Sequence, residues 1–134
     1  MQPEAKFYKE LKKNIPSIIW NRVENLSLLG MPDLLGYNKK QCFFTVELKV
    51  VKGNKIKFSP HQIAWHKTHP QNTFIMAKAL DPCTLKTSSI SLFRGSSIMA
   101  LARYGMKVDA CACGFPACAS MFDEVGLTLE NFGA

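Results

Sequence analysis

Three charged residues of the kinds that bind metal ions and act on phosphates occur close together in the first half of the sequence. Asp33 follows Gly-Met-Pro at the start of a β-type segment, where the proline restricts the direction of the chain. Glu47 and Lys49 are two residues apart in a strongly apolar strand, so their side chains leave the same face of it. Charges in such a strand are costly to bury without a partner or a ligand. We therefore take these three residues as the candidate site.

If the two segments pair as a hairpin, Asp33 and Glu47 lie side by side. Paired carboxylates form a hard-oxygen site suited to Mg²⁺, and the backbone carbonyl of Leu48 would add a further oxygen ligand. The ion would polarise a phosphodiester and acidify a water molecule. Lys49 would hold or activate that water and offset the charge that develops on the phosphate. The alternative is a structural ion pair between Lys49 and one of the two acids.

The positive charge of the chain is concentrated in the half that contains these residues. The formal net charge is +7; residues 1–70 hold 12 Lys and Arg against 5 acids, whereas residues 71–134 hold 5 of each. A basic half suits a polyanion such as DNA, although it could equally be a solvated surface that keeps the protein soluble. The candidate phosphate contacts flank the site strand: Lys39, Lys40, Lys52, Lys55 and Lys57.

The length of 134 residues predicts a single domain, with a core at about 3–94 and a C-terminal extension at about 95–134. No apolar run approaches the roughly 20 residues that a membrane helix needs. The first residues also lack the apolar segment of a signal peptide. We therefore expect an intracellular, cytoplasmic protein with no membrane partner.

Apolar spacing and turn residues predict helices and strands in alternation. Ser59, Pro60 and Gln62 together form an N-cap, a first-turn proline and a capping box, which mark the start of a helix. The predicted helices cover 4–14, 60–69 and 96–104, and the predicted strands cover 17–24, 32–37, 42–51, 73–79 and 88–93. The order α-β-β-β-α-β, followed by a further strand and helix, predicts an α/β fold with a mixed sheet flanked by helices.

Three segments in this order resemble the PD-(D/E)xK nuclease superfamily. They are Gly30-Met31-Pro32-Asp33-Leu34, Phe44-Thr45-Val46-Glu47-Leu48-Lys49 and Ser59-Pro60-His61-Gln62-Ile63-Ala64-Trp65-His66. Within the superfamily, the chain is similar to the VRR-NUC and archaeal Holliday-junction-resolvase group, above all to small stand-alone phage nucleases. The resemblance covers roughly residues 3–80.

This resemblance implies a restriction-endonuclease-like αβββαβ core and Mg²⁺- or Mn²⁺-dependent cleavage of branched DNA. A phage-encoded member would act in the cytoplasm of its host. A four-way junction needs two symmetric cuts, so a resolvase is expected to be a C2 homodimer. The apolar segment 88–104 is a candidate dimer surface.

The resemblance also implies further site residues. The family has a metal-binding glutamate on its first helix, for which Glu4 and Glu10 are candidates. At about 100° per residue, Glu4 lies on the apolar stripe that meets the sheet, whereas Glu10 lies about 120° away among lysines and is expected to face solvent. We choose Glu4 as the third ligand; its alternative role is a favourable acid in the first turn of a helix.

Two more residues match family positions, and each of them has two possible roles. Gln62 matches a glutamine at the edge of the site, but it is also the capping-box partner of Ser59. Arg22 stands on the first strand, where relatives often carry an arginine; it would contact the scissile phosphate or pair with Glu24.

Histidines and cysteines allow other metal hypotheses. We expect His61, His66 and His69 to be polar helix positions, because no third ligand lies near them in the sequence. The spacing of Cys111, Cys113 and Cys118 differs from the paired Cys-x-x-Cys of zinc sites, so we expect small buried thiols. The tail from Met106 extends beyond the family core.

The sequence thus predicts a metal-dependent, structure-selective DNA endonuclease, with Holliday-junction resolution as the first hypothesis. Flap, nicking or exonuclease activity on the same site is the alternative within the enzyme class. A non-catalytic nucleic-acid-binding protein is the alternative outside it. Asp33 and Glu47 disfavour a protein that only binds nucleic acid, because carboxylates without a metal repel phosphate.

Overall fold

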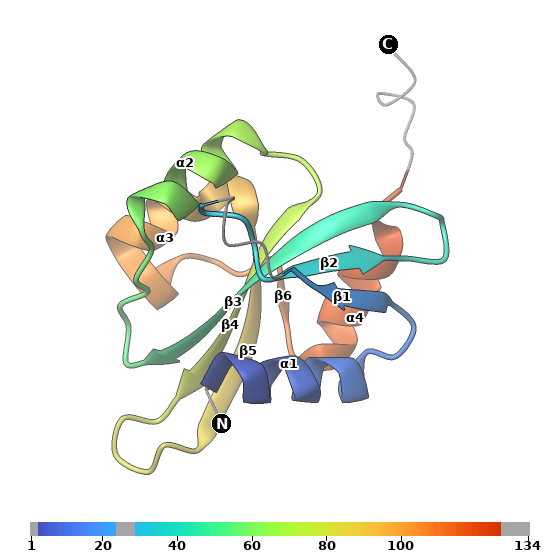
Figure 1. Cartoon of the computed structure of the whole chain (residues 1–134). Helices are drawn as coiled ribbons and strands as arrows, with labels where there is room; N and C mark the ends of the chain where they lie inside the picture. Colours follow the sequence, from blue (N-terminus) through green and yellow to red (C-terminus); the bar gives the residue numbers. More distant parts are fainter. Residues whose placement is uncertain (1–2, 24–28, 127–134) are drawn as a thin grey trace.

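Six strands form one mixed sheet in the order β1-β2-β3-β4-β5-β6 (Figure 1). The structure is a computed structural model that describes residues 3–23 and 29–126. Neighbouring strands are antiparallel except β3 and β4, which are parallel and joined through helix α2, as a parallel pair requires. The strands are β1 (Ile19–Arg22), β2 (Leu34–Tyr37), β3 (Phe43–Lys52), β4 (Thr73–Leu80), β5 (Thr87–Arg94) and β6 (Ala112–Cys113).

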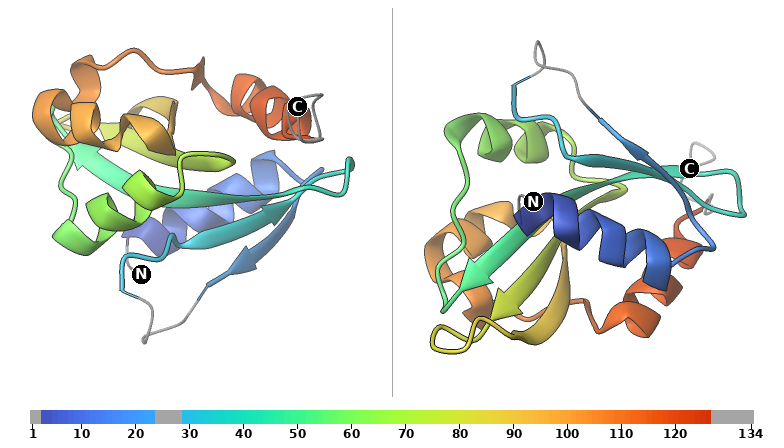
Figure 2. Two further views of the ribbon diagram at one scale, coloured as in Figure 1. Left: turned by 90° about the horizontal axis from the view of Figure 1, so that it is seen from above. Right: turned by 60° about the horizontal axis from the view of Figure 1, so that its bottom comes forward.

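Within the described residues, four α-helices cover the sheet: α1 (Pro3–Asn14), α2 (Pro60–Thr68), α3 (Ile98–Tyr104) and α4 (Phe115–Glu124). Helices α1 and α4 contact each other, as do α2 and α3, and the two pairs can be followed in Figure 2. Each pair belongs to its own apolar cluster: Phe7 and Phe122 represent the α1–α4 cluster, and Ile98 and Leu101 represent the α2–α3 cluster. The sheet therefore has a separate core on each face.

The alternation along β3 decides which residues belong to which core. Phe44, Val46 and Leu48 are buried in the α1–α4 cluster. Because successive side chains of a strand point to opposite faces, Glu47 and Lys49 lie on the α2–α3 face. The candidate site is therefore on the side of the sheet covered by α2.

Local sequence signals account for the first two helices. In α1, Phe7 and Leu11 are fully buried, and the helix ends shortly before Pro16. In α2, the Ser59 hydroxyl accepts a hydrogen bond from the Gln62 amide, and the Gln62 side chain accepts one from the Ser59 amide. The predicted capping box is confirmed.

The predicted fold class is confirmed: a mixed sheet is flanked by helices in the order α1-β1-β2-β3-α2-β4. The predicted strands and helices are all present, with boundaries shifted by a few residues. Strand β6 and helix α4 were not predicted from the sequence. The spacing of Phe115, Cys118 and Phe122 at i, i+3 and i+7 was the available signal for α4.

The tail contributes to the core. The ring of Phe122 stacks on that of Phe44 with centroids 4.8 Å apart and planes at 12°. Asn38, in the β2–β3 turn, donates through Nδ2 to the backbone carbonyls of Phe122 and Val125. Residues assigned to a C-terminal extension therefore complete the core on the α1 face. The single-domain assignment stays a prediction.

The segment 88–104 was predicted as a candidate dimer surface, but most of its apolar residues are buried in the structure. Strand β5 lies between β4 and β6, and its residues Ile90, Leu92 and Phe93 are buried. Within the segment 88–104, only α3 exposes large apolar side chains, namely Met99 and Tyr104. Among the residues that the structure describes, no helix is long and apolar enough to cross a membrane.

Candidate active site

The β2–β3 hairpin brings Asp33 and Glu47 together. Leu34 pairs with Val46, so Asp33, one residue before β2, lies opposite Glu47. The Asp33 Oδ2 atom accepts a hydrogen bond of 2.8 Å from the Leu48 amide, and its backbone carbonyl accepts one from Val23, also of 2.8 Å. Asp33 is thus held between β1 and β3.

Gly30 explains the start of the Gly-Met-Pro-Asp motif. Its φ is +82°, and a Cβ atom at this position would collide with the backbone carbonyl of His61 in the first turn of α2. Only glycine permits both this conformation and this close approach. The motif therefore packs the Asp33 loop against the helix that carries Gln62.

Glu47 is only 3% exposed, and its two oxygens have different surroundings. Oε1 accepts a hydrogen bond of 3.1 Å from Gln62 Nε2. Oε2 is buried and receives no donor from the described part of the chain. The Glu47 carboxyl group lies beside that of Asp33, and the two can hydrogen-bond to each other only if they share a proton.

The electrostatics of the pair follow from this arrangement. Burial, followed by the charge of Asp33, raises the pKa of Glu47 from its ordinary value of 4.5 to about 9, although Lys49 opposes the shift. Without a ligand the pair therefore retains a proton at neutral pH. A cation bound between the two acids would replace that proton.

Lys49 is held by Gln62 and Phe58. Its Nζ atom donates to Gln62 Oε1 at 3.0 Å and lies 4.9 Å from the centre of the Phe58 ring. Phe58 was missed in the sequence, although its place just before the Ser59 cap favours contacts with the start of the helix.

Gln62 combines the two roles that were considered alternatives. Its Oε1 atom accepts from both the Ser59 amide and Lys49 Nζ, each at 3.0 Å. Its Nε2 atom donates to Glu47. A carbonyl oxygen has two lone pairs, so the cap and the site contact do not exclude each other.

Glu4 and Glu10 occupy different environments. Glu10, which was predicted to face solvent, is only partly exposed, because Lys78 of β4 donates to its Oε1 atom at 2.5 Å. The long lysine side chain reaches from the sheet to the border of the helix's apolar stripe. Glu4 is exposed at the start of α1, and its charge makes a small contribution to raising the pKa of Glu47. Of the two acids, Glu4 is thus the one near the site.

The predicted cations divide into two groups. Lys49, Lys52, Lys55 and Lys57 line one hollow of about 430 Å³ with Glu4, which we call the basic pocket. Lys39 and Lys40 lie in the turn at the other end of the hairpin. The five residue steps from Glu47 to Cys42 span roughly 17 Å at 3.3 Å per residue. The fold therefore does not bring Lys39 and Lys40 to the carboxylates.

Arg22 lies next to the β2–β3 hairpin, which carries the candidate site. It is the last residue of β1 and pairs with Leu34, the residue after Asp33. Its side chain is exposed. Glu24, its proposed ion-pair partner, lies outside the described residues.

The donor set fits a hard divalent cation. Asp33 and Glu47 supply carboxylate oxygens, and Glu47 Oε2 is a buried acceptor without a donor. The Leu48 amide points to Asp33, and the carbonyl of a strand residue points to the same side as its amide. Within residues 3–23 and 29–126, no group of three or more His, Cys, Asp or Glu side chains is close enough to hold a metal ion. An ion there would need backbone or water oxygens as well.

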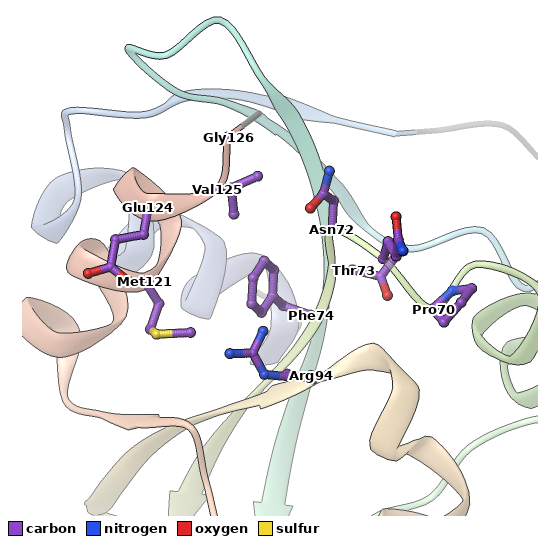
Figure 3. Close-up of a pocket in the computed structure, with 10 residues that line it drawn as sticks. Pro70, Asn72, Thr73, Phe74, Arg94, Met121, Glu124, Val125 and Gly126 are labelled. Carbon is purple, nitrogen blue, oxygen red and sulfur yellow. The ribbon is translucent and has the colours of Figure 1, made fainter. Parts of the chain in front are cut away.

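A different hollow, shown in Figure 3, contains none of the predicted site residues. It measures about 330 Å³ and lies between the start of β4, the end of β5 and the end of α4. Arg94, Phe74 and Met121 lie around it, and the Glu124 carboxylate is at its border. It is separate from the Asp33–Glu47 pair.

The histidine and cysteine expectations are only partly met. His66 is a completely buried polar position of α2; its Nδ1–H donates to the Gln62 carbonyl at 2.9 Å. Of the tail thiols, Cys118 is buried, Cys111 is half-buried and Cys113 is exposed. Burial raises the pKa of the Cys118 thiol to about 12, which makes it unreactive.

The chain has a structural likeness among known proteins. No family model and no curated protein matches the sequence. The fold is similar to that of Hjc, a Holliday junction resolvase from the archaeal hyperthermophile Archaeoglobus fulgidus, with 18% identity and a TM-score of 0.46. The alignment covers 68% of this chain and 72% of that chain. A likeness at this level does not bear on the chemistry of the site.

Proposed function

We propose that this protein is a metal-dependent deoxyribonuclease of the PD-(D/E)xK type. The observation that carries the proposal is the Asp33–Glu47 pair, in which the buried Glu47 carboxyl group lies beside the half-buried Asp33 carboxyl group and its Oε2 atom has no donor among the described residues. Two adjacent acids that must share a proton are costly for a fold, whereas a cation bound between them would replace that proton. Such perturbed acids are typical of functional sites.

Each site residue then has a defined task. Asp33 and Glu47 would hold Mg²⁺ or Mn²⁺, with the Leu48 carbonyl as a further oxygen donor and Glu4 acting through a water ligand; the ion would supply Lewis-acid chemistry to the phosphodiester and to the attacking water. Lys49 donates to that water or to the phosphate, where negative charge develops. Gln62 positions Lys49 and Glu47 relative to each other. Water attacks the phosphorus in line with the leaving oxygen.

The substrate is DNA in this proposal. The basic pocket lies beside Lys49 and offers three further cations to the phosphates on one side of the cut. Arg22, at the end of β1, would contact a phosphate near Asp33. The motif resemblance supports a preference for branched DNA, with the Holliday junction as the first candidate. It also supports a C2 homodimer. Flap, nicking or exonuclease cleavage would use the same residues.

A cleavage panel tests the proposal. The substrates are a four-way junction, a flap, a splayed arm and a plain duplex, each with Mg²⁺, Mn²⁺ or EDTA. We expect cutting of branched DNA only with a divalent ion, and its loss in Asp33→Asn and Lys49→Gln. Asp109→Asn removes an exposed acid elsewhere and serves as the charge-matched control.

Two outcomes would contradict parts of the proposal. Equal cutting of plain duplex would overturn structure selectivity but leave the nuclease in place. If no substrate is cut and Asp33→Asn changes only DNA affinity, the protein is a nucleic-acid-binding protein without catalytic activity.

A further inference from the structure

An apolar groove continues the hairpin face that carries the two acids. After Asp33 and Glu47, the next cross-strand pair on this face is Leu35 with Thr45, and the one after it contains Phe43. Leu35, Thr45 and Phe43 line a hollow of about 370 Å³, which we call the aromatic groove. It therefore begins one cross-strand pair away from the acids.

Aromatic rings stand on both sides of this groove. Phe43 is 57% exposed on the hairpin side, with the Tyr37 ring beside it at a centroid distance of 4.6 Å. On the α2 side, the rings of Trp65 and His69 are stacked 4.0 Å apart with planes at 7°. A large ring so exposed in a concave, apolar hollow indicates a binding surface.

The charges around the groove identify a polyanion as its occupant. The exposed side chains of Lys39 and Lys40 lie beyond Phe43, in the turn of the same hairpin, and Lys49 lies beyond the acids. Among the described residues, those that line the groove include no aspartate or glutamate. Flat apolar rings between cations are the combination that binds single-stranded nucleic acid, because the bases stack and the phosphates pair.

We infer that the aromatic groove binds unpaired bases of the DNA strand that is cut in the neighbouring site. The inference rests on the proposed nuclease function and specifies its substrate: DNA with a single-stranded segment next to the scissile phosphate. Bases within a duplex are stacked on their neighbours and are not available to Phe43 or Trp65. A flap, a splayed arm or an opened junction presents such bases, whereas a closed duplex does not.

Binding of oligothymidylate by the Asp33→Asn protein tests the groove without cleavage. Fluorescence anisotropy gives its affinity for the single strand and for a duplex of the same length. Phe43→Ala in this background is expected to weaken single-strand binding about tenfold, within the range for one lost stacking contact, and to leave duplex binding unchanged. Phe43→Trp is expected to retain the affinity. Leu85→Ala removes an equally exposed apolar side chain from the β4–β5 turn and should change neither.

The alternatives give distinct results. If the Asp33→Asn protein binds the single strand with the same affinity whether or not it also carries Phe43→Ala, the inference is overturned. So does a change from dimer to monomer on sedimentation caused by Phe43→Ala, because a second copy of the chain would then cover the groove. If Phe43→Ala loses single-strand affinity but the unaltered protein cuts no DNA, the groove assignment stands and the nuclease proposal fails.

Discussion

Glu47 accepts a hydrogen bond of 3.1 Å from the side-chain amide of Gln62, a residue that also caps its own helix. The same amide holds Lys49 through its oxygen. One side chain thus connects the start of α2 to two charged residues of β3. This connection makes the geometry of the site depend on the helix N-terminus.

Gln62→Ala should impair both stability and activity, whereas Ser59→Ala should impair stability alone. Each variant removes one half of the capping box, at a cost of about 1 kcal/mol in the free energy of unfolding. Only Gln62→Ala also releases Lys49 and Glu47, so we expect at least about a tenfold loss in cleavage rate, as for a misplaced catalytic group. Urea unfolding and single-turnover cleavage measure the two effects. Equal cleavage rates in both variants would contradict a positioning role for Gln62.

Glu47→Gln should stabilise the protein in EDTA while abolishing its response to Mg²⁺. The folded protein must keep Glu47 protonated beside Asp33, whereas the unfolded chain ionises it freely at neutral pH. The amide needs no proton, so we expect a gain on the order of 1–3 kcal/mol in the free energy of unfolding. Thermal unfolding with EDTA and with Mg²⁺ checks this, and Asp109→Asn is the control. A Glu47→Gln protein less stable in EDTA than the parent would show that the acid pair is structural.

His66 should make the protein less stable in acid. Burial lowers the pKa of His66 below its ordinary value of 6.5. As the pH falls below 6.5, this histidine therefore binds a proton in the unfolded state before it does so in the folded state. Stability contributed by the neutral ring is present above pH 6.5 and is lost as the pH falls through and below that value. Urea unfolding between pH 7.5 and 5 should show a shallower decline in His66→Phe than in the parent protein. His61→Gln, which alters an exposed histidine of the same helix, should leave the decline unchanged.

Phe122→Ala should destabilise the whole molecule. Phe122 is fully buried and stacks on Phe44 of the central strand, so its removal leaves a large cavity. We expect a loss of about 3–5 kcal/mol in the free energy of unfolding. Phe43→Ala, which removes a ring of the same size from the surface, should cost less than about 1 kcal/mol. A similar small effect for both variants would mean that α4 is not part of the cooperative core.

The sequence by itself determined the local elements and one face of the site. The cap of α2 depends on residues three apart, and the common face of Glu47 and Lys49 depends on residues two apart. Such relations follow from helix and strand periodicity and need no knowledge of distant contacts. The alternation of β3 likewise determined which of its residues are apolar core.

Only the tertiary structure decided relations between distant parts of the chain. Glu10 pairs with Lys78, 68 residues away, although its helical angle alone placed it in solvent. Asn38 holds the backbone of Phe122, 84 residues away, and so places α4 in the core. The aromatic groove needs both the hairpin and α2. These contacts depend on how whole elements pack, because burial changes which partner a long or polar side chain can reach.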